Sequence, residues 1–224
     1  MSLVIAIKDR DRVVLGSDKQ ASVGDYKNHN NTKIWLVQDL QGAIMGSVGT
    51  ARASQIIQYS SVVDKNCLEN INNIDTDFIV NSLAPTIATA LKANGFNIDS
   101  TSDSPCTMLP NAFLFAYKDK AWMIWNDLSV TELEDYLAIG SGSDVARGVL
   151  YATRDKNPFE RIFTCIDAAT DSTLFVDDGI DLLATKEYPN DFKLVGKILG
   201  IEEKPKPKKK VEKKKPTKEK TIKE

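Results

Sequence analysis

The order of strand-like and helix-like segments is the feature that most constrains this fold. Short β-rich runs and amphipathic helical stretches come in blocks: strands, two helices, strands, two helices, and a last pair of strands. The predicted strands are residues 2–8, 12–18, 33–37, 42–48, 112–118, 121–125, 135–140, 171–176 and 180–185. The predicted helices are residues 49–63, 76–95, 144–153 and 157–170.

This block order favours an α+β fold over a fold in which strands and helices alternate singly. Two sheets stacked face to face, with a layer of helices on each outer side, would bury all of these segments. The sequence therefore predicts a four-layer αββα sandwich.

The second predicted helix contains residues that should mark its start, a bend and its end. Pro85 lies inside it and should kink or split it, because proline lacks the backbone N–H that a helix interior needs. Gly95 fits the position just after the helix end. One of Asp75, Thr76 and Asp77 should cap the helix start.

Charge divides the chain into a body and a tail. The net charge is −2, but residues 202–224 hold eleven Lys and five acidic residues, so this segment carries +6 and the rest carries −8. We expect residues 2–201 to form one domain and residues 202–224 to be a disordered Lys-rich tail. The tail is either a solvated extension or a tether for an acidic partner. An acidic body argues against nucleic-acid binding as the main function.

Three cysteines, Cys67, Cys106 and Cys165, form no CxxC motif, so we expect reduced thiols and a cytoplasmic protein. The first residues lack the pattern of a secretory signal. No apolar run reaches the roughly 18 residues that a membrane span requires. The sequence indicates no metal site and no cofactor.

Ser2 is the first residue with a catalytic possibility. An initiator Met followed by a small residue is normally removed, which would leave Ser2 with a free α-amine beside its hydroxyl. A serine hydroxyl needs a base to become a nucleophile. The one histidine, His29, lies in a polar loop and is expected to be solvated. The α-amine is the better candidate, since its unperturbed pKa is about 7.7–8.0.

Several short motifs then occur in a characteristic order. They are SLVIAIK, VVLGSDKQAS, TKIW, MGSVGTARA, AIGSGSDVARGVL and AATD. This ordered set resembles the proteasome β-subunits and the bacterial HslV peptidase, which are N-terminal nucleophile (Ntn) hydrolases. The resemblance covers roughly residues 2–186 and leaves the tail unmatched. It implies the αββα fold of that family.

The resemblance also implies six catalytic positions. Ser2 matches the N-terminal threonine nucleophile, Asp18 and Lys33 the acid and lysine, Gly46 the oxyanion-hole glycine, and Ser141 and Asp171 the residues that orient the terminal amine. A lysine beside the nucleophile lowers the pKa of both the hydroxyl and the amine. Serine lacks the methyl group that restricts the threonine rotamer, so we expect weaker peptide-bond hydrolysis.

The same register implies a substrate pocket lined by Ala21, Asn31, Ile44 and Val48. These side chains are small and largely apolar. We therefore expect a preference for apolar side chains before the cleaved bond.

The leading hypothesis is a threonine-protease-like endopeptidase with a serine nucleophile, working inside a homo-oligomeric ring on protein or peptide substrates. An ATP-dependent unfoldase is an implied partner, and no P-loop occurs in this chain. Two alternatives remain open. One is a catalytically inactive structural ring subunit, which the combination of Ser2, Asp18, Lys33 and Gly46 disfavours. The other is a small-molecule Ntn amidohydrolase.

Overall fold

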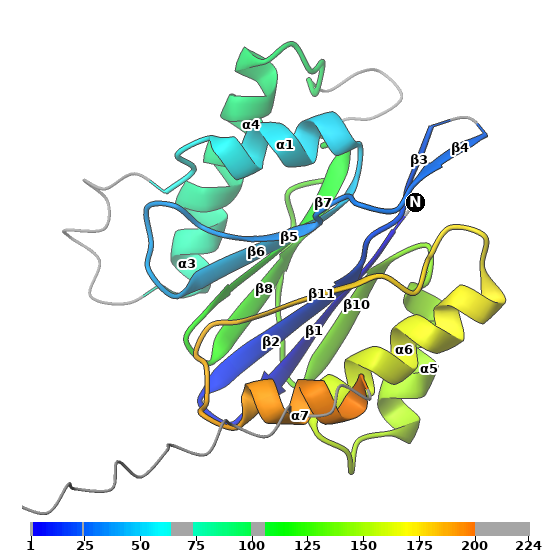
Figure 1. The fold of residues 1–224 in the computed structure, drawn as a ribbon. Helices are drawn as coiled ribbons and strands as arrows, with labels where there is room; N and C mark the ends of the chain where they lie inside the picture. Colours follow the sequence, from blue (N-terminus) through cyan, green and yellow to red (C-terminus); the bar gives the residue numbers. More distant parts are fainter. Residues whose placement is uncertain (1, 24, 64–73, 100–105, 200–224) are drawn as a thin grey trace, which may run out of the picture.

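The computed structural model describes residues 2–23, 25–63, 74–99 and 106–199. Met1, Cys67 and the predicted Lys-rich tail lie outside the described residues. Within them, two antiparallel sheets form the centre of the molecule, and a small hairpin projects from one end of them (Figure 1).

The strands form a four-stranded sheet and a five-stranded sheet. The four-stranded sheet has the order β10 (Tyr136–Gly140), β1 (Leu3–Asp9), β2 (Arg12–Asp18) and β11 (Ile180–Ala184). The five-stranded sheet has the order β5 (Ile34–Leu36), β6 (Ala43–Gly49), β7 (Asn111–Tyr117), β8 (Lys120–Ile124) and β9 (Val130–Glu132). The hairpin consists of β3 (Ala21–Val23) and β4 (Tyr26–Asn28).

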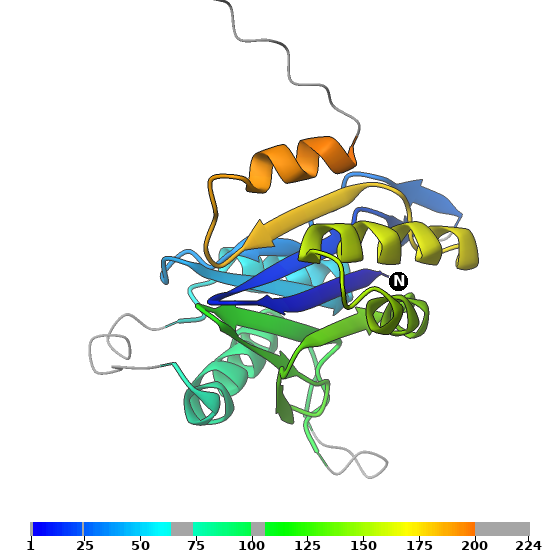
Figure 2. The ribbon, with the colours of Figure 1, turned by 90° about the horizontal axis from the view of Figure 1, so that it is seen from below.

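Helices cover both outer faces of the sheets. On the five-stranded sheet lie α1 (Ala51–Tyr59), α3 (Thr76–Phe78), the π-helical segment η1 (Ile79–Leu83) and α4 (Ala84–Ala93). On the four-stranded sheet lie α5 (Ser143–Ala152), α6 (Pro158–Ser172) and α7 (Asp191–Ile198). Figure 2 shows α7 lying along β11.

Three apolar clusters hold the layers together. One cluster, which includes Val4, Leu15 and Leu114, lies between the two sheets. The other two lie between each sheet and its helices, around Phe113 and around Ile162. The predicted four-layer αββα sandwich is confirmed.

The predicted helix of residues 76–95 is observed from Thr76 to Ala93, and its hydrogen bonding changes before Pro85. The helix widens to a π-turn immediately before the proline, where Ala84 N–H bonds to the carbonyl of Ile79, five residues earlier. The Asp75 carboxylate caps the first turn. Gly95 follows the helix end with a φ of +88°, in the left-handed region that glycine reaches at little cost. The cap and the terminal glycine are confirmed, whereas the backbone remains helical through Pro85 and is not split there.

The predicted strand at residues 171–176 is wrong. Helix α6 runs on to Ser172, and the residues after it are irregular up to Ile180. Leu174 is exposed while Val176 is buried, so the segment lacks the alternation that would pair it with a sheet. The sequence also gave no signal for the three-residue strands of the β3–β4 hairpin, for β9, or for α7.

Helix α7 is attached through a buried cation. Arg12 is 3% exposed, ion-pairs with Asp9 at 2.9 Å and with Asp191, and lies 4.2 Å from the ring centroid of Tyr188. Because Asp191 opens α7, this contact ties the helix to β2. No helix in the described ranges is both long and apolar enough to cross a membrane.

Candidate active site around Ser2

Two cavities lie beside Ser2, and they share only Ser2 and Gly49. The first, of about 330 Å³, is lined by residues of the β3–β4 hairpin, the entry to β5 and the turn from β6 into α1. The second, of about 430 Å³, is lined by the same turn together with Gly140 and Ser141. An extended substrate could therefore place side chains on either side of Ser2.

Ser2 is held by its neighbours in the four-stranded sheet. It is 8% exposed and directly precedes β1. The next backbone N–H, that of Leu3, donates to Asp18 Oδ1 at 2.8 Å. Ser141 Oγ donates to the carbonyl oxygen of Ser2 at 3.3 Å. These contacts fix the backbone of Ser2 at the mouth of both cavities.

A buried ion pair lies next to Ser2. Lys33 Nζ is 2.6 Å from Asp18 Oδ1, and the two side chains are 3% and 0% exposed. Asp18 Oδ2 accepts a second backbone hydrogen bond, from Gln20 N at 3.1 Å. Lys33 lines the first cavity together with Ser2.

Burial shifts both groups of this pair towards their neutral forms. It raises the pKa of Asp18 and lowers the pKa of Lys33, while the attraction between the two charges opposes both shifts. In the described part of the chain, Lys33 Nζ makes no directed hydrogen bond beyond this ion pair. The charge that Lys33 keeps in this pair favours the deprotonated forms of a hydroxyl and an amine beside it.

Gly46 and Ile44 do not line either cavity. Gly46 is paired within the ladder, and a Cβ there would point between the sheets, 2.9 Å from Val4 and 3.1 Å from Ile34. Ile44 is fully buried in the same inter-sheet cluster. The side chain of Ile44 faces away from the cavities because alternate residues of a strand face opposite sides of the sheet, and the backbone of Gly46 is paired with strands on both sides.

The predicted pocket residues divide between the two cavities. Ala21 and Asn31 line the first, whereas Val48 lines the second. Most side chains lining the first cavity are polar, and they include Lys33 and Arg52. The first cavity therefore combines the expected small residue Ala21 with polar side chains that the sequence analysis did not assign to it.

A buried amide that sequence reasoning missed shapes the turn after β6. Asn111, which is fully buried, accepts a hydrogen bond from Thr50 N at 2.7 Å. Its amide nitrogen donates to Ser47 Oγ at 2.8 Å and to Ser54 Oγ at 3.0 Å. Gly49, with a φ of +132°, lies directly above this network, and a Cβ there would be 2.7 Å from the Asn111 amide.

The acid near the hairpin is Asp177, not Asp171. Asp171 is exposed near the end of α6 and lines neither cavity beside Ser2. Asp177 is 7% exposed. Its Oδ1 accepts a hydrogen bond from Lys19 N at 3.1 Å, and its Oδ2 lies 2.7 Å from His29 Nδ1. Its charge also favours the protonated form of Lys33. His29 is exposed, as expected, but it is tied to Asp177 and not to Ser2.

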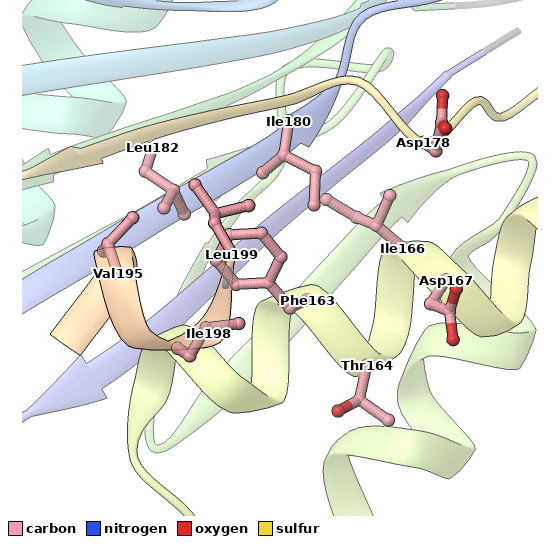
Figure 3. Close-up of a pocket in the computed structure, with 10 residues that line it drawn as sticks. All are labelled: Phe163, Thr164, Ile166, Asp167, Asp178, Ile180, Leu182, Val195, Ile198 and Leu199. Carbon is pink, nitrogen blue, oxygen red and sulfur yellow. The ribbon is translucent and has the colours of Figure 1, made fainter. Parts of the chain in front are cut away.

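A further cavity of about 490 Å³ lies away from Ser2, between α6, β11 and α7. Figure 3 shows apolar side chains from the three elements facing one another, among them Phe163, Leu182 and Ile198. The Thr164 hydroxyl at its edge is bonded to its own helix. Among the described residues, no three His, Cys, Asp or Glu side chains cluster closely enough to hold a metal ion.

Comparison with solved structures finds the same fold in several peptidase structures. BPH from Thiobacillus denitrificans in complex with epoxomicin matches with a TM-score of 0.63 and 18% identity over 84% of this chain and 100% of that chain. Eukaryotic HslV from Trypanosoma brucei matches with a TM-score of 0.54 and 19% identity over 81% and 98%. A Gly-1 mutant of Anbu from Hyphomicrobium sp. strain MC1 gives 0.58 and 17% over 82% and 81%.

No protein-family model matches the sequence, and no curated protein matches it. The structural matches cover most of the chain and nearly all of BPH and HslV. The chain therefore has the fold of the HslV-like, proteasome-type Ntn hydrolases.

Proposed function

We propose that this chain is a proteasome-type peptidase subunit in which Ser2, made N-terminal by removal of Met1, is the nucleophile. The observation that carries the proposal is the buried pair of Lys33 and Asp18 beside Ser2. Two buried charges cost several kcal/mol of desolvation each, which their attraction only partly offsets. A structural subunit gains nothing from placing such a pair at the mouth of a cavity.

The proposed reaction has two halves. Ser2 Oγ loses its proton to the α-amine, while the positive charge of Lys33 stabilises the developing alkoxide, and Ser2 Oγ attacks the substrate carbonyl carbon. The tetrahedral intermediate expels the amine half of the substrate, which takes up a proton, and leaves an ester on Ser2. The α-amine then removes a proton from a water molecule, which hydrolyses the ester and frees the acid product.

An oxyanion donor is needed for both tetrahedral intermediates, and we assign this role to Gly49. Ser47 N–H bonds to the carbonyl of Lys33 at 2.9 Å, so it points towards β5. Because N–H directions alternate along a strand, Gly49 N–H points to the same side, beyond the start of β5. Such a donor contributes about 10²–10³ in rate.

Two further residues have proposed positioning roles. Ser141 holds the carbonyl of Ser2 and so sets the direction of the first residue. We propose Asp177 as a supporting acid, because its charge favours the protonated form of Lys33. Neither group is proposed to contact the substrate.

We further propose that the active chains enclose Ser2 in a homo-oligomeric ring that takes unfolded protein or peptide. An ATP-dependent unfoldase would then supply extended chains. The cavities on both sides of Ser2 support an extended substrate. Size measurement of the purified protein by light scattering tests this assembly, and a monomer with amidase activity would favour a small-molecule hydrolase instead.

Epoxomicin, the compound present in the BPH structure, is the probe for the nucleophile. We expect the intact mass of the purified protein to show loss of Met1 and, after treatment, one added inhibitor. The Ser2→Ala variant should lose Met1 and gain no adduct, because its hydroxyl is gone.

Two controls make the labelling result decisive. Cys106→Ser removes an exposed thiol that electrophiles could modify, and it should leave the adduct unchanged. A peptide with a different electrophilic warhead guards against poor fit of one inhibitor. Retained Met1, or an adduct that persists in Ser2→Ala, would contradict the proposed nucleophile and favour an inactive ring subunit.

A further inference from the structure

The first cavity beside Ser2 has an unusual lining for a peptidase pocket predicted to be apolar. All but three of its lining residues carry polar side chains. Its two cationic side chains are Lys33 and Arg52, and no described carboxylate lines it. This sign is opposite to that of the chain outside the tail, which carries a net charge of −8 by the count given above.

The two cations differ in how much charge they leave for a ligand. Lys33 is neutralised by Asp18 at 2.6 Å. Arg52 is exposed, and its one described hydrogen bond is a long one of 3.4 Å to the carbonyl of Asn94. Within the described residues no carboxylate pairs with Arg52. No described carboxylate therefore competes with an anionic ligand for its guanidinium.

Helix α1 adds positive potential at the same place. Ala51 and Arg52 are its first two residues, and both line the cavity. The first turn contains no acidic residue, and the side chain of Thr50 does not cap it. The unsatisfied N–H groups of a helix start favour a negative charge nearby.

The floor of the cavity carries a network of polar side chains. Ser47 lines it, is 1% exposed, and is bonded to the buried Asn111 amide. Ser54 belongs to the same network through its contact with Ser47 Oγ at 3.1 Å. Ser54 is only partly buried, so its hydroxyl is the member of this network that a polar occupant could reach.

We propose that the first cavity receives an acidic side chain, from the substrate residue before the cleaved bond, and that Arg52 is the specificity-determining residue that binds its carboxylate. The inference rests on the proposed peptidase function of Ser2. It replaces the apolar preference that the sequence suggested.

The experiment compares fluorogenic peptides that differ only at the residue before the cleaved bond, with Glu, Gln, Leu or Lys there. We expect kcat/KM for the Glu peptide to exceed that for its uncharged isostere Gln about fivefold, as for an ion pair that stays partly solvated. In Arg52→Gln this ratio should fall to about one. Arg52→Lys should recover part of it, because the charge returns without the two-pronged geometry.

Arg147→Ala is the matched control. Arg147 is an exposed arginine of α5, paired with Asp144, and its loss should leave the Glu to Gln ratio unchanged. Raising the salt concentration from about 0.05 M to about 0.5 M should lower the ratio in the wild-type protein, since the charges at an open cavity are screened. A ratio that ignores both Arg52 and salt would overturn the inference.

Labelling of Ser2 distinguishes failure of the proposed peptidase function from failure of the proposed acidic preference. A protein that is labelled at Ser2 but cleaves the Leu peptide best is a peptidase without the proposed acidic preference. A protein that is not labelled at Ser2 lacks the proposed function itself. A labelled protein that prefers Gln over Glu would assign the cavity to neutral polar side chains and refute the role of Arg52.

Discussion

Replacing Lys33 with Met is expected to reduce the rate of Ser2 labelling by about 10²–10³, the range for loss of one electrostatic group in acyl transfer. Met is similar in length to Lys but carries no charge to stabilise the Ser2 alkoxide. The variant also leaves Asp18 buried without its counter-charge at 2.6 Å. Breaking a buried pair in this way costs about 3–5 kcal/mol in the free energy of unfolding. Intact-mass time courses and urea unfolding measure the two effects.

The double variant Asp18→Asn/Lys33→Met separates catalysis from stability. It removes both charges, so most of the stability lost in Lys33→Met should return. Asn offers one acceptor oxygen, so one of the two backbone hydrogen bonds to Asp18 is still lost. Labelling of Ser2 should remain slow. If the double variant labels Ser2 at the wild-type rate, the pair has only a structural role.

The pH dependence of Lys33→Met provides an independent check. Burial already raises the pKa of Asp18, and loss of Lys33 removes the main opposing effect. In the unfolded chain an Asp carboxyl titrates near 3.9. Above that pH the folded variant binds more protons than the unfolded one, so its free energy of unfolding should fall as the pH rises towards the folded-state pKa. The double variant should lack this fall, since Asn does not titrate.

The fold was predictable because the core segments carry strong local patterns. The hairpin of β1 and β2 and the hairpin of β7 and β8 are continuous apolar runs bounded by charged turns, as strands covered on both faces require. Pro85 and Gly95 are local signals, because proline lacks a backbone N–H and glycine readily adopts the positive φ that follows a helix. The error at residues 171–176 arose because Leu, Phe and Val after a helix can form an irregular connection as easily as a strand.

The candidate site was predictable only where residue type and chain order identify a role. Asp18 and Lys33 follow from short motifs, and the structure brings them together beside Ser2. Gly46 and Ile44 lie outside both cavities because a shift of one residue along β6 reverses the face of the sheet. Asn111 and Asp177 gave no signal, since an Asn at the start of a strand or an Asp in a loop acquires its role only from partners that lie far away in sequence.

Gly140 shows most clearly what sequence alone could not give. It is paired with Leu3 at the start of β1, and a Cβ on it would lie 1.9 Å from the carbonyl oxygen of Ser2 and 2.7 Å from the carbonyl carbon. Its φ of +104° is also unfavourable for any residue with a side chain. Since the added Cβ would overlap the Ser2 carbonyl, Gly140→Ala requires Ser2 and the end of β10 to move apart.

We therefore expect Gly140→Ala to slow labelling of Ser2 by about 10²-fold, because a misplacement of about 1 Å has that effect on a reacting group. Gly95→Ala is the matched control. It has a comparable φ of +88° but nothing within 4 Å of the added Cβ. It should lose about 1–2 kcal/mol of stability from the left-handed conformation and keep the wild-type labelling rate. If both variants label Ser2 equally fast, close packing of β10 against Ser2 does not position the nucleophile. The supporting result is slow labelling in Gly140→Ala alone, with both variants folded by circular dichroism. Contact with β10 would then position the backbone of Ser2, and residue 140 would need to be glycine for labelling.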